Sequence, residues 1–180
     1  EKLTAAIEKF FWDEEKGAYI DSFTSGKRNV TRHANIFAIL FDIADKQKQE
    51  KILTNVLEND EIPAITTPYF NFFELDVLCQ MGKLTEVLDK IRSYWGGMLD
   101  LGAVTFWEEY DPSVPKEEQY DMYGDHFGKS LCHAWAASPI YFLAKYFAGL
   151  DLVNKDGVTY VLKPQMQYFT DLDCTLPVGS

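Results

Sequence analysis

The chain has 180 residues, and its net charge of −11, from 17 basic and 28 acidic side chains, is opposite to the basic surface that nucleic-acid binding requires. The same charge disfavours binding to an anionic membrane, and no apolar run reaches the ~20 residues of a membrane-spanning helix. Because 47% of the residues are hydrophobic, the chain is not a disordered tail. Its length is sufficient for one domain with its own core.

Cysteine and aromatic usage narrow the class of protein further. Cys79, Cys132 and Cys174 are far apart and include no CxxC pair, so neither a disulfide framework nor a zinc site is expected. We expect reduced and mostly buried thiols. The 4 Trp, 10 Tyr and 13 Phe are the unusual feature, because aromatic rings fill cores but also line sugar-binding clefts.

The first third of the chain predicts three helices. Apolar residues recur at helical spacing over residues 2–11, over a buried segment from about 32 to 44, and over 52–57. Residues 12–20 form a turn-rich loop with short strand character between the first two helices. The charged run 45–51 is expected to be a solvated polar bridge before the third.

The remainder predicts a fourth helix that begins at Pro68 and ends at Gly82, since proline fits the first helical turn and glycine the end. A fifth helix over residues 84–95 is expected to break at Gly96 and Gly97. The following irregular region, 98–128, is long enough to be functional. A sixth helix is expected over 129–147, with Pro139 kinking it or lying in its first turn.

Helices two, four and six are apolar nearly all round, whereas helices one, three and five have one apolar face. Two concentric helical layers produce this alternation, so we predict helical hairpins arranged as an α/α toroid or solenoid. Residues 157–162 change to strand-like alternation near the end of the chain.

Two acidic residues of the irregular region, Glu108 and Glu109, are flanked by the aromatic residues Trp107 and Tyr110. Such a carboxylate suits glycoside hydrolysis, because rings can hold a sugar and an apolar setting raises the pKa of a carboxyl group. On an extended backbone Glu108 and Glu109 point to opposite sides, so only one would face a pocket. The alternative, two surface acids beside a core tryptophan, stays open.

The three histidines are further candidates. His133 is predicted to open an apolar helix, where it would either bond a sugar hydroxyl or be a core histidine satisfied by backbone. His126 and His133, seven residues apart, would be ~10 Å apart on a helix, too far to share a metal ion. His33 is predicted on a buried helix, where polar groups must be paired. No cofactor or metal motif occurs, so neither is expected.

Several blocks of the sequence resemble the second half of the catalytic domain of bacterial α-L-rhamnosidases. They are, in chain order, TPYFNFFELDVLCQMG, IRSYWGGMLDLG, GAVTFWEEYDP and HFGKSLCHAWAASPIYFLAKYFAGL. Their order and spacing also agree with that family. The resemblance extends from the first helix to near Leu150, and residues 157–180 resemble the start of the family's following β-sandwich.

The resemblance implies a mainly α-helical fold, a toroid of six helical hairpins with its site in loops at one end. It implies inverting hydrolysis of terminal α-L-rhamnosides, in which an acid protonates the leaving oxygen and a carboxylate activates water. Glu108 matches the general base, His133 a sugar-contacting histidine, and Tyr110 a position that is often tryptophan. The predicted catalytic residue is Glu108, and the predicted substrate-binding residues are Trp107, Glu109, Tyr110, His133 and Trp135.

The family's general acid lies in the first half of the toroid, which would precede Glu1. Because a closed toroid needs roughly 300 residues or more, we expect this chain to be the base-bearing half of a larger glycosidase, inactive alone. Residues 1–150 would form three helical hairpins, about half of the ring, and 151–180 a linker and the start of a truncated β-sandwich. The uncovered inner helix faces predict self-association.

Other functions stay open at this stage. The chain could belong to a toroid glycosidase for a different sugar, since a fold does not choose its substrate. It could instead be a carbohydrate-binding module without catalysis, or a helical scaffold with a protein partner. The expected ligand is a rhamnose-containing glycan or glycoside, with no nucleic-acid or membrane partner. The sequence assigns no compartment.

Overall fold

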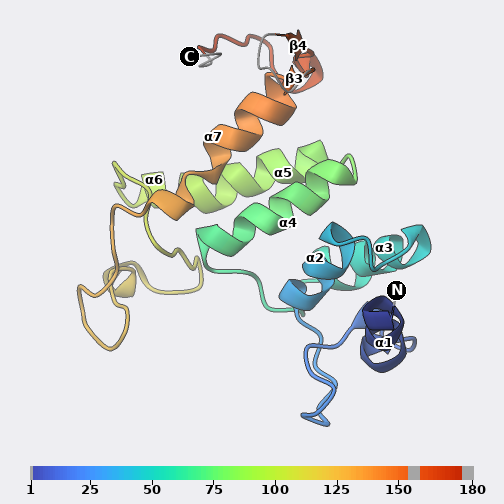
Figure 1. Cartoon of the computed structure of the whole chain (residues 1–180). Helices are drawn as coiled ribbons and strands as arrows, with labels where there is room; N and C mark the ends of the chain where they lie inside the picture. Colours follow the sequence, from blue (N-terminus) through green and yellow to red (C-terminus); the bar gives the residue numbers. More distant parts are fainter. Residues whose placement is uncertain (1, 154–158, 176–180) are drawn as a thin grey trace. The chain divides into compact units, whose positions relative to one another are not determined.

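The computed structural model describes residues 2–153 and 159–175, and the chain forms two compact units, residues 1–65 and 66–180 (Figure 1). Each unit is described below by itself. The described part of the chain is mainly helical, with two short two-stranded sheets, as the sequence predicts. Within it, no helix combines the length and the apolar character needed to cross a membrane.

The first unit contains the elements α1 (Lys2–Phe11), β1 (Trp12–Asp13), β2 (Ala18–Tyr19), α2 (Arg32–Leu40), α3 (Lys46–Ile52) and the π-helical segment η1 (Leu53–Leu57). The predicted helix over residues 2–11 is confirmed. The strand character expected within residues 12–20 is also confirmed, because β1 and β2 pair antiparallel with Trp12 opposite Tyr19.

Asn35 joins the hairpin of the first unit to α2. Its side chain is fully buried, and its carbonyl oxygen accepts the backbone N–H of Tyr19 at 2.8 Å. Its amide nitrogen donates to the carbonyl of Tyr19 at 2.9 Å and to that of Thr31 at 2.8 Å. A buried amide must be satisfied, so this asparagine fixes where β2 lies on the helix.

The second helix is shorter than predicted, because α2 ends at Leu40 instead of near Ala44. Asp42 takes a left-handed backbone conformation, with φ of +53°. The chain then turns back, and the N–H groups of Ile43 and Ala44 both donate to the carbonyl of Ala38 at 2.9 Å. The local turn, which apolar periodicity does not reveal, ends the helix.

The charged run 45–51 was expected to be a solvated polar bridge: it is mostly exposed, as expected, but it forms a helix. Asp45 caps helix α3, its side chain accepting the N–H of Lys48 at 2.9 Å. Two lysines of this helix also pair with acids, Lys48 with Glu8 and Lys51 with Glu14 at 2.9 Å. The polar run therefore forms a capped helix, two of whose lysines contact acids of the preceding segments.

The second unit contains α4 (Pro68–Gln80), α5 (Leu84–Lys90), η2 (Ile91–Trp95), α6 (Gly96–Asp100), η3 (Lys116–Glu118), η4 (Ala134–Ala136), α7 (Ser138–Phe142), η5 (Leu143–Phe147), β3 (Leu150–Leu152), β4 (Tyr160–Leu162) and η6 (Met166–Tyr168). Helices α4 and α5 lie side by side (Figure 1). The predicted start of α4 at Pro68 is confirmed. Gly82 has a φ of +74°, which suits the turn that follows this helix.

Gly96 and Gly97 do not break the fifth helix. The helix continues from α5 through the π-helical η2 into α6, and Gly96 has helical dihedrals. A Cβ atom on Gly97 would lie 2.7 Å from a ring carbon of Tyr110. This glycine therefore serves close packing between the helix and the irregular region, which is why it stands inside a helix despite its low propensity.

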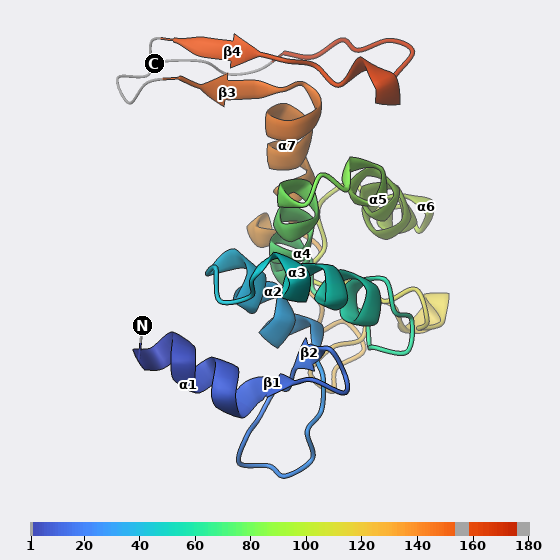
Figure 2. The ribbon, with the colours of Figure 1, turned by 90° about the vertical axis from the view of Figure 1, so that its right-hand side faces the viewer.

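The sixth helix begins nine residues later than predicted, at Ser138 instead of Lys129, with Pro139 in its first turn. Residues 129–137 are irregular except for the short turn η4. The predicted end at Gly149 is confirmed, as this residue has a φ of +71°. Strands β3 and β4 then pair antiparallel (Figure 2). Of the strand predicted over 157–162, residues 157 and 158 lie outside the described residues.

The expectation of mostly buried thiols holds for one cysteine only. Cys79 on α4 is buried, and desolvation raises the pKa of its thiol to about 12. Cys132 and Cys174 are exposed. Both lie in irregular segments, where hydrophobic periodicity gives no information on burial.

Candidate functional site

The irregular region folds back on itself so that its two notable segments pair. The N–H of Glu108 donates to the carbonyl of Ser130 at 2.9 Å, and that of His133 donates to the carbonyl of Phe106 at 2.8 Å. The hydroxyl of Thr105 also donates to the carbonyl of Leu131. These bonds bring Glu108 and His133 together although 25 residues separate them in the sequence.

The carboxylate of Glu108 is buried, with 6% of the residue exposed, and each of its oxygens accepts a hydrogen bond from a neutral donor. The hydroxyl of Tyr123 donates to Oε1 at 2.8 Å, and the backbone N–H of Ser130 donates to Oε2 at 3.0 Å. Nδ1 of His133 lies 3.9 Å from Oε2. Glu108 is therefore not a surface acid.

The pKa of Glu108 lies below its ordinary value of 4.5, mainly because the Ser130 N–H and then the Tyr123 hydroxyl stabilise the charged form. His133 and Lys129 act in the same direction, whereas burial opposes it. The expected rise in pKa was thus wrong: aromatic neighbours do desolvate this carboxyl, but two donors outweigh that effect. At neutral pH Glu108 is an ionised proton acceptor.

Lys129 places a positive charge close to this carboxylate. The residue is buried, and desolvation lowers the pKa of its ammonium group. Four nearby carboxylates oppose that effect by raising the pKa of Lys129. From the largest effect to the smallest they are Glu109, Asp111, Asp121 and Glu108. Glu109 itself is half-buried, whereas Glu108 is buried.

Trp107 and Tyr110 are packing residues in this structure. Trp107 is buried and contacts Tyr120 edge-on, with ring centroids 5.6 Å apart. The N–H of Tyr110 donates to the hydroxyl of Tyr94 at 3.1 Å, and its ring covers Gly97. The two residues on either side of the glutamate pair thus tie this segment to the rest of the second unit.

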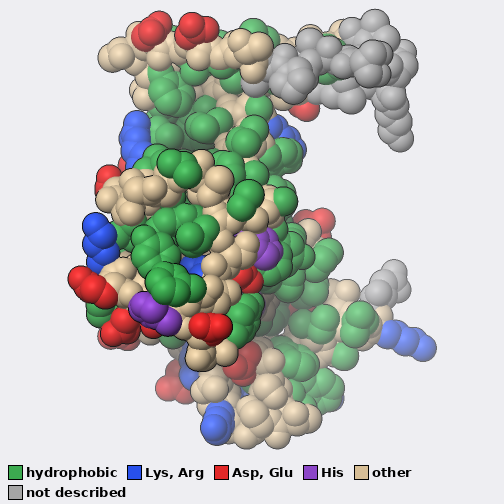
Figure 3. Space-filling view, turned by 90° about the vertical axis from the view of Figure 1, so that its left-hand side faces the viewer, with side chains coloured by type: hydrophobic (Ala, Val, Ile, Leu, Met, Phe, Trp, Pro, Cys, Tyr) green, Lys and Arg blue, Asp and Glu red, His purple; other side chains and the backbone are tan. Residues whose placement is uncertain are grey.

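His133 and Trp135 are accessible by contrast. The two rings lie 4.2 Å apart between centroids, and Trp135 also contacts Tyr69 at the start of α4, at 5.3 Å. His133 has an extended backbone and precedes the short turn η4, so the prediction that it opens a helix was wrong. Figure 3 faces this region, and hydrophobic side chains are exposed there beside acidic and histidine side chains.

An apolar cavity of about 830 Å³ adjoins His133. Its walls come from the η2–α6 helix, from residues 103–106 and from residues 132–134. Trp95 in this wall donates its ring N–H to the carbonyl of Ala136 at 2.8 Å, which joins the helix to the irregular region. The arrangement offers an ionised buried base, an accessible imidazole and exposed aromatic rings within one loop system.

Residues 1–147 match the family model described as the bacterial alpha-L-rhamnosidase 6 hairpin glycosidase domain. The chain belongs to this family. A solved structure, the rhamnosidase from Klebsiella oxytoca with rhamnose bound, is similar over 81% of this chain at 32% identity, with a TM-score of 0.70. No curated protein sequence is detectably similar.

Membership of the six-hairpin glycosidase family confirms the predicted fold class, a helical portion of a toroid with short strands. The chain spans about a quarter of the Klebsiella protein, since it covers 27% of that chain.

The other two histidines lie apart from this constellation. Nδ1 of His126 pairs with Oδ1 of Asp121 at 2.6 Å, and both side chains are largely exposed. Within residues 2–153 and 159–175, no three His, Cys, Asp or Glu side chains are grouped so that they could hold a metal ion. His33 is exposed, so the expectation of a buried histidine on α2 was wrong.

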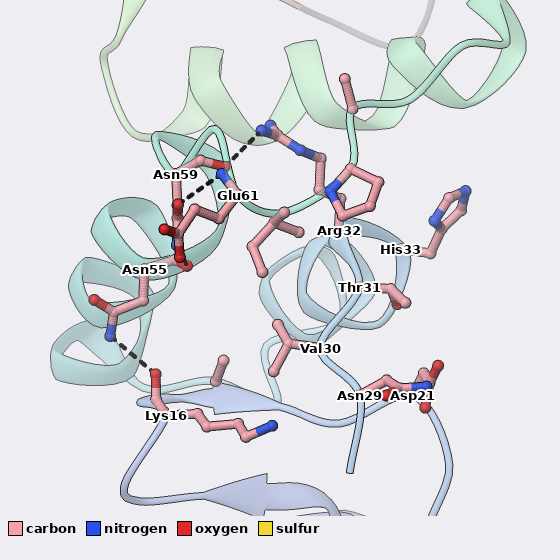
Figure 4. Close-up of a pocket in the computed structure, with 14 residues that line it drawn as sticks. Lys16, Asp21, Asn29, Val30, Thr31, Arg32, His33, Asn55, Asn59 and Glu61 are labelled. Carbon is pink, nitrogen blue, oxygen red and sulfur yellow. Dashed lines mark hydrogen bonds between the residues drawn. The ribbon is translucent and has the colours of Figure 1, made fainter. Parts of the chain in front are cut away.

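His33 instead lines a polar cavity of about 740 Å³ in the first unit (Figure 4). Several polar groups of this cavity serve the chain's own backbone. Arg32 donates to the carbonyls of Leu57 at 2.9 Å and Asn59 at 3.3 Å, and Asn55 donates to the carbonyl of Lys16 at 3.1 Å. These contacts join the end of η1 to the hairpin and to α2, which is a structural role.

Sequence reasoning missed Tyr123, Ser130 and Tyr69. Tyr123 precedes Gly124 in a segment rich in acids and aromatics, and a glycine there indicates a tight turn. That pattern could have placed Tyr123 at a turn. Nothing in the sequence shows that the turn lies over Glu108, or that the backbone of Ser130 faces the same carboxylate.

Proposed function

We propose that this chain carries the general base of an inverting glycoside hydrolase that acts on terminal α-L-rhamnosides. The buried and ionised Glu108, held by Tyr123 and Ser130 and adjoined by His133, is the observation that supports the role. The rhamnose bound in the similar Klebsiella rhamnosidase supports the choice of sugar.

In this reaction Glu108 takes a proton from water while the water oxygen bonds to the anomeric carbon. The bond from that carbon to the aglycone oxygen breaks, and a general acid protonates the departing oxygen. A base must be ionised before the reaction, and the lowered pKa of Glu108 meets that requirement. We assign the acid to another part of the larger protein, so the chain alone is expected to bind sugar without turnover.

His133 and Trp135 are proposed to contact the sugar. Their rings contact each other at a tilt and are accessible. An imidazole can bond a sugar hydroxyl, and an indole face can cover C–H groups. Tyr69 extends this aromatic surface. Trp107, Tyr110 and Glu109 are proposed to support the site, the first two through the packing described above.

Replacing Glu108 by Gln in the longer protein that carries this chain tests the role of the base. Hydrolysis of a chromogenic α-L-rhamnoside should fall by about 10²–10⁴-fold, with rhamnose binding in calorimetry retained. Glu117→Gln, an exposed change in the same loop, is the matched control. Proton NMR of the first product should show inverted, β-configured rhamnose.

The outcomes separate the alternatives. Full activity of Glu108→Gln would contradict the assigned base. Inverting hydrolysis of a different glycoside would keep the mechanism and replace the sugar. Sugar binding that never leads to turnover, in any protein that carries the chain, would favour a carbohydrate-binding module.

Self-association of this chain remains our prediction. Large apolar side chains are exposed in the second unit, among them Leu99 on α6 and Ile140 on α7. Exposed apolar side chains favour self-association where they form a contiguous patch. Sedimentation velocity should show species larger than a monomer at high micromolar concentration, and a monomer under those conditions would contradict the prediction.

A further inference from the structure

Tyr123 lies in a backbone conformation that is rare for a tyrosine. Its φ is +57°, and Gly124 after it has a φ of +81°. On both sides of this pair, Met122 and Asp125 exchange N–H···O bonds of 3.0 Å. Two central residues with positive φ are the mark of a tight type I′ turn, in which the first position disfavours a bulky side chain.

The turn is fixed by close packing. A Cβ atom on Gly128 would meet the carbonyl of Met122 at well below contact distance, so the turn lies directly on this glycine. The N–H of Gly128 donates to the carbonyl of Asp125 at 3.2 Å, and the N–H of Lys129 donates to that of Tyr120, also at 3.2 Å. Residues 120–130 therefore form one compact loop, which we call the 120–130 loop.

The 120–130 loop supplies both hydrogen-bond donors to Glu108. The donor from Ser130 is a backbone N–H within the paired segments, so its position is fixed by the fold. The donor from Tyr123 is a side-chain hydroxyl at the tip of the turn, on a residue that is 79% exposed. A residue this exposed gains little from burial, so packing does not explain its unfavourable backbone conformation.

We propose that Tyr123 is a positioning residue for the proposed base: the left-handed turn delivers its hydroxyl to Oε1 of Glu108, which holds the carboxylate in one orientation. This inference rests on the proposed function, because it deepens the role of Glu108 there. Ser130 anchors Oε2, and the two donors together fix the plane of the carboxylate.

Other charged groups also lie near Glu108, so the variants used as tests leave these residues unchanged. Nδ1 of His133 lies 3.9 Å from Oε2, Lys129 is buried close by, and Glu109 also acts on Tyr123. The hydrogen bond to Glu108 raises the pKa of the Tyr123 hydroxyl, so this hydroxyl remains a donor throughout the neutral range.

The first test uses this chain itself and needs no activity. The carboxyl carbon of Glu108 is followed by ¹³C NMR as pH is lowered, with Glu108→Gln to assign the resonance. Removing the hydroxyl in Tyr123→Phe removes a donor to the charged form, so the pKa of Glu108 should rise. Tyr168→Phe, at a ring that packs on Phe147, should leave it unchanged. An unchanged Glu108 titration in Tyr123→Phe would overturn the proposal.

The second test measures rhamnoside hydrolysis in the longer protein. Tyr123→Phe should lower kcat about tenfold at acidic pH, the size expected for one hydrogen bond to a charged group, with KM little changed. Because the base must be ionised, the acidic limb of the pH profile should move to higher pH and the loss should shrink as pH rises. A loss that is uniform across pH would indicate a structural role and overturn the proposal.

A pair of variants tests the turn. A Cβ atom on Gly124 meets nothing within 4 Å, so substitutions there act through backbone conformation rather than through a clash. Asn tolerates positive φ and Val does not, so Gly124→Val should shift the Glu108 titration as Tyr123→Phe does, whereas Gly124→Asn should not. Equal behaviour of the two variants would argue against the turn as the delivering element.

The two proposals can fail separately. If no protein carrying the chain hydrolyses a rhamnoside, the hydrolase proposal fails while the NMR titration still tests the contact between Tyr123 and Glu108. If Glu108→Gln abolishes hydrolysis but Tyr123→Phe leaves both the titration and the pH profile unchanged, only the positioning role is overturned.

Discussion

Two buried glutamates of the second unit are stabilised in different ways. Glu74 on α4 is 2% exposed and forms an ion pair with Lys90 at the end of α5, with a nitrogen–oxygen distance of 2.5 Å. Glu108 in the irregular region is 6% exposed and is held by two neutral donors, with an imidazole at 3.9 Å. One carboxylate is paired directly with a cation, and the other is kept ionised by dipoles.

This difference distinguishes an acid that joins two helices from the acid that we propose as the general base. The ion pair between Glu74 and Lys90 joins two helices. Neutral donors stabilise the charge while lone pairs on the oxygens stay open to a water molecule. The regular helices carry the first arrangement, and the loops, whose backbone N–H groups are not used in helices, carry the second.

The largest expected effects are a loss of activity when Glu108 is replaced and a loss of stability when Glu74 is replaced. Glu108→Gln should lower hydrolysis by about 10²–10⁴-fold, whereas Glu74→Gln should leave kcat in the longer protein within about twofold. Replacing Glu74 removes one partner of a buried ion pair, so the free energy of unfolding should fall by about 2–3 kcal/mol in urea denaturation of this chain.

A matched control for Glu74 is Glu86→Gln. The pair of Glu86 with Lys83 on the surface of α5 spans 3.8 Å and is largely exposed, so its loss should change stability by less than about 0.5 kcal/mol. Equal destabilisation by both variants would show that burial does not set the strength of the Glu74 pair.

A smaller effect tests how the helices support the loop that carries Glu108. Gly97→Ala would bring a Cβ atom 2.7 Å from a ring carbon of Tyr110, so stability should fall by about 1–3 kcal/mol. Gly96→Ala meets nothing within 4 Å in the same helix and should stabilise the chain by up to ~1 kcal/mol. Both are measured by urea denaturation.

If the amide resonance of Ser130 shifts in Gly97→Ala but not in Gly96→Ala, the strain at Gly97 reaches the Glu108 site. If both alanine variants have the same stability, the packing of Tyr110 on Gly97 is not what holds this part of the loop.

Motif and spacing predicted a substantial part of the candidate site. Glu108 and His133 were singled out from the sequence and lie together in the structure. Tyr123 was not singled out, because its hydrogen bond to Glu108, fifteen positions earlier, depends on the turn that carries Tyr123. Such a contact is formed by tertiary pairing and leaves no local pattern of residue types.

The helices show the same division. Apolar periodicity predicted that α1, α4 and α5 exist. Helices α4 and α5 bury residues at that spacing, whereas no residue of α1 is buried. It misplaced the end of α2 and the start of α7, and the glycine pair Gly96 and Gly97 wrongly predicted a break in a continuous helix. Those boundaries depend on Asp42 turning left-handed, on residues 129–137 pairing with the other loop segment, and on Tyr110 packing against a glycine.

The sequence by itself therefore determined the family and the helical class, and it singled out Glu108 as the proposed base, since composition, period and motif are local properties. Only the tertiary structure decided the protonation of that acid. The pKa of Glu108 is set by a hydroxyl and a backbone N–H from the 120–130 loop, and the direction of the shift follows from donors that exist only once the loop has folded.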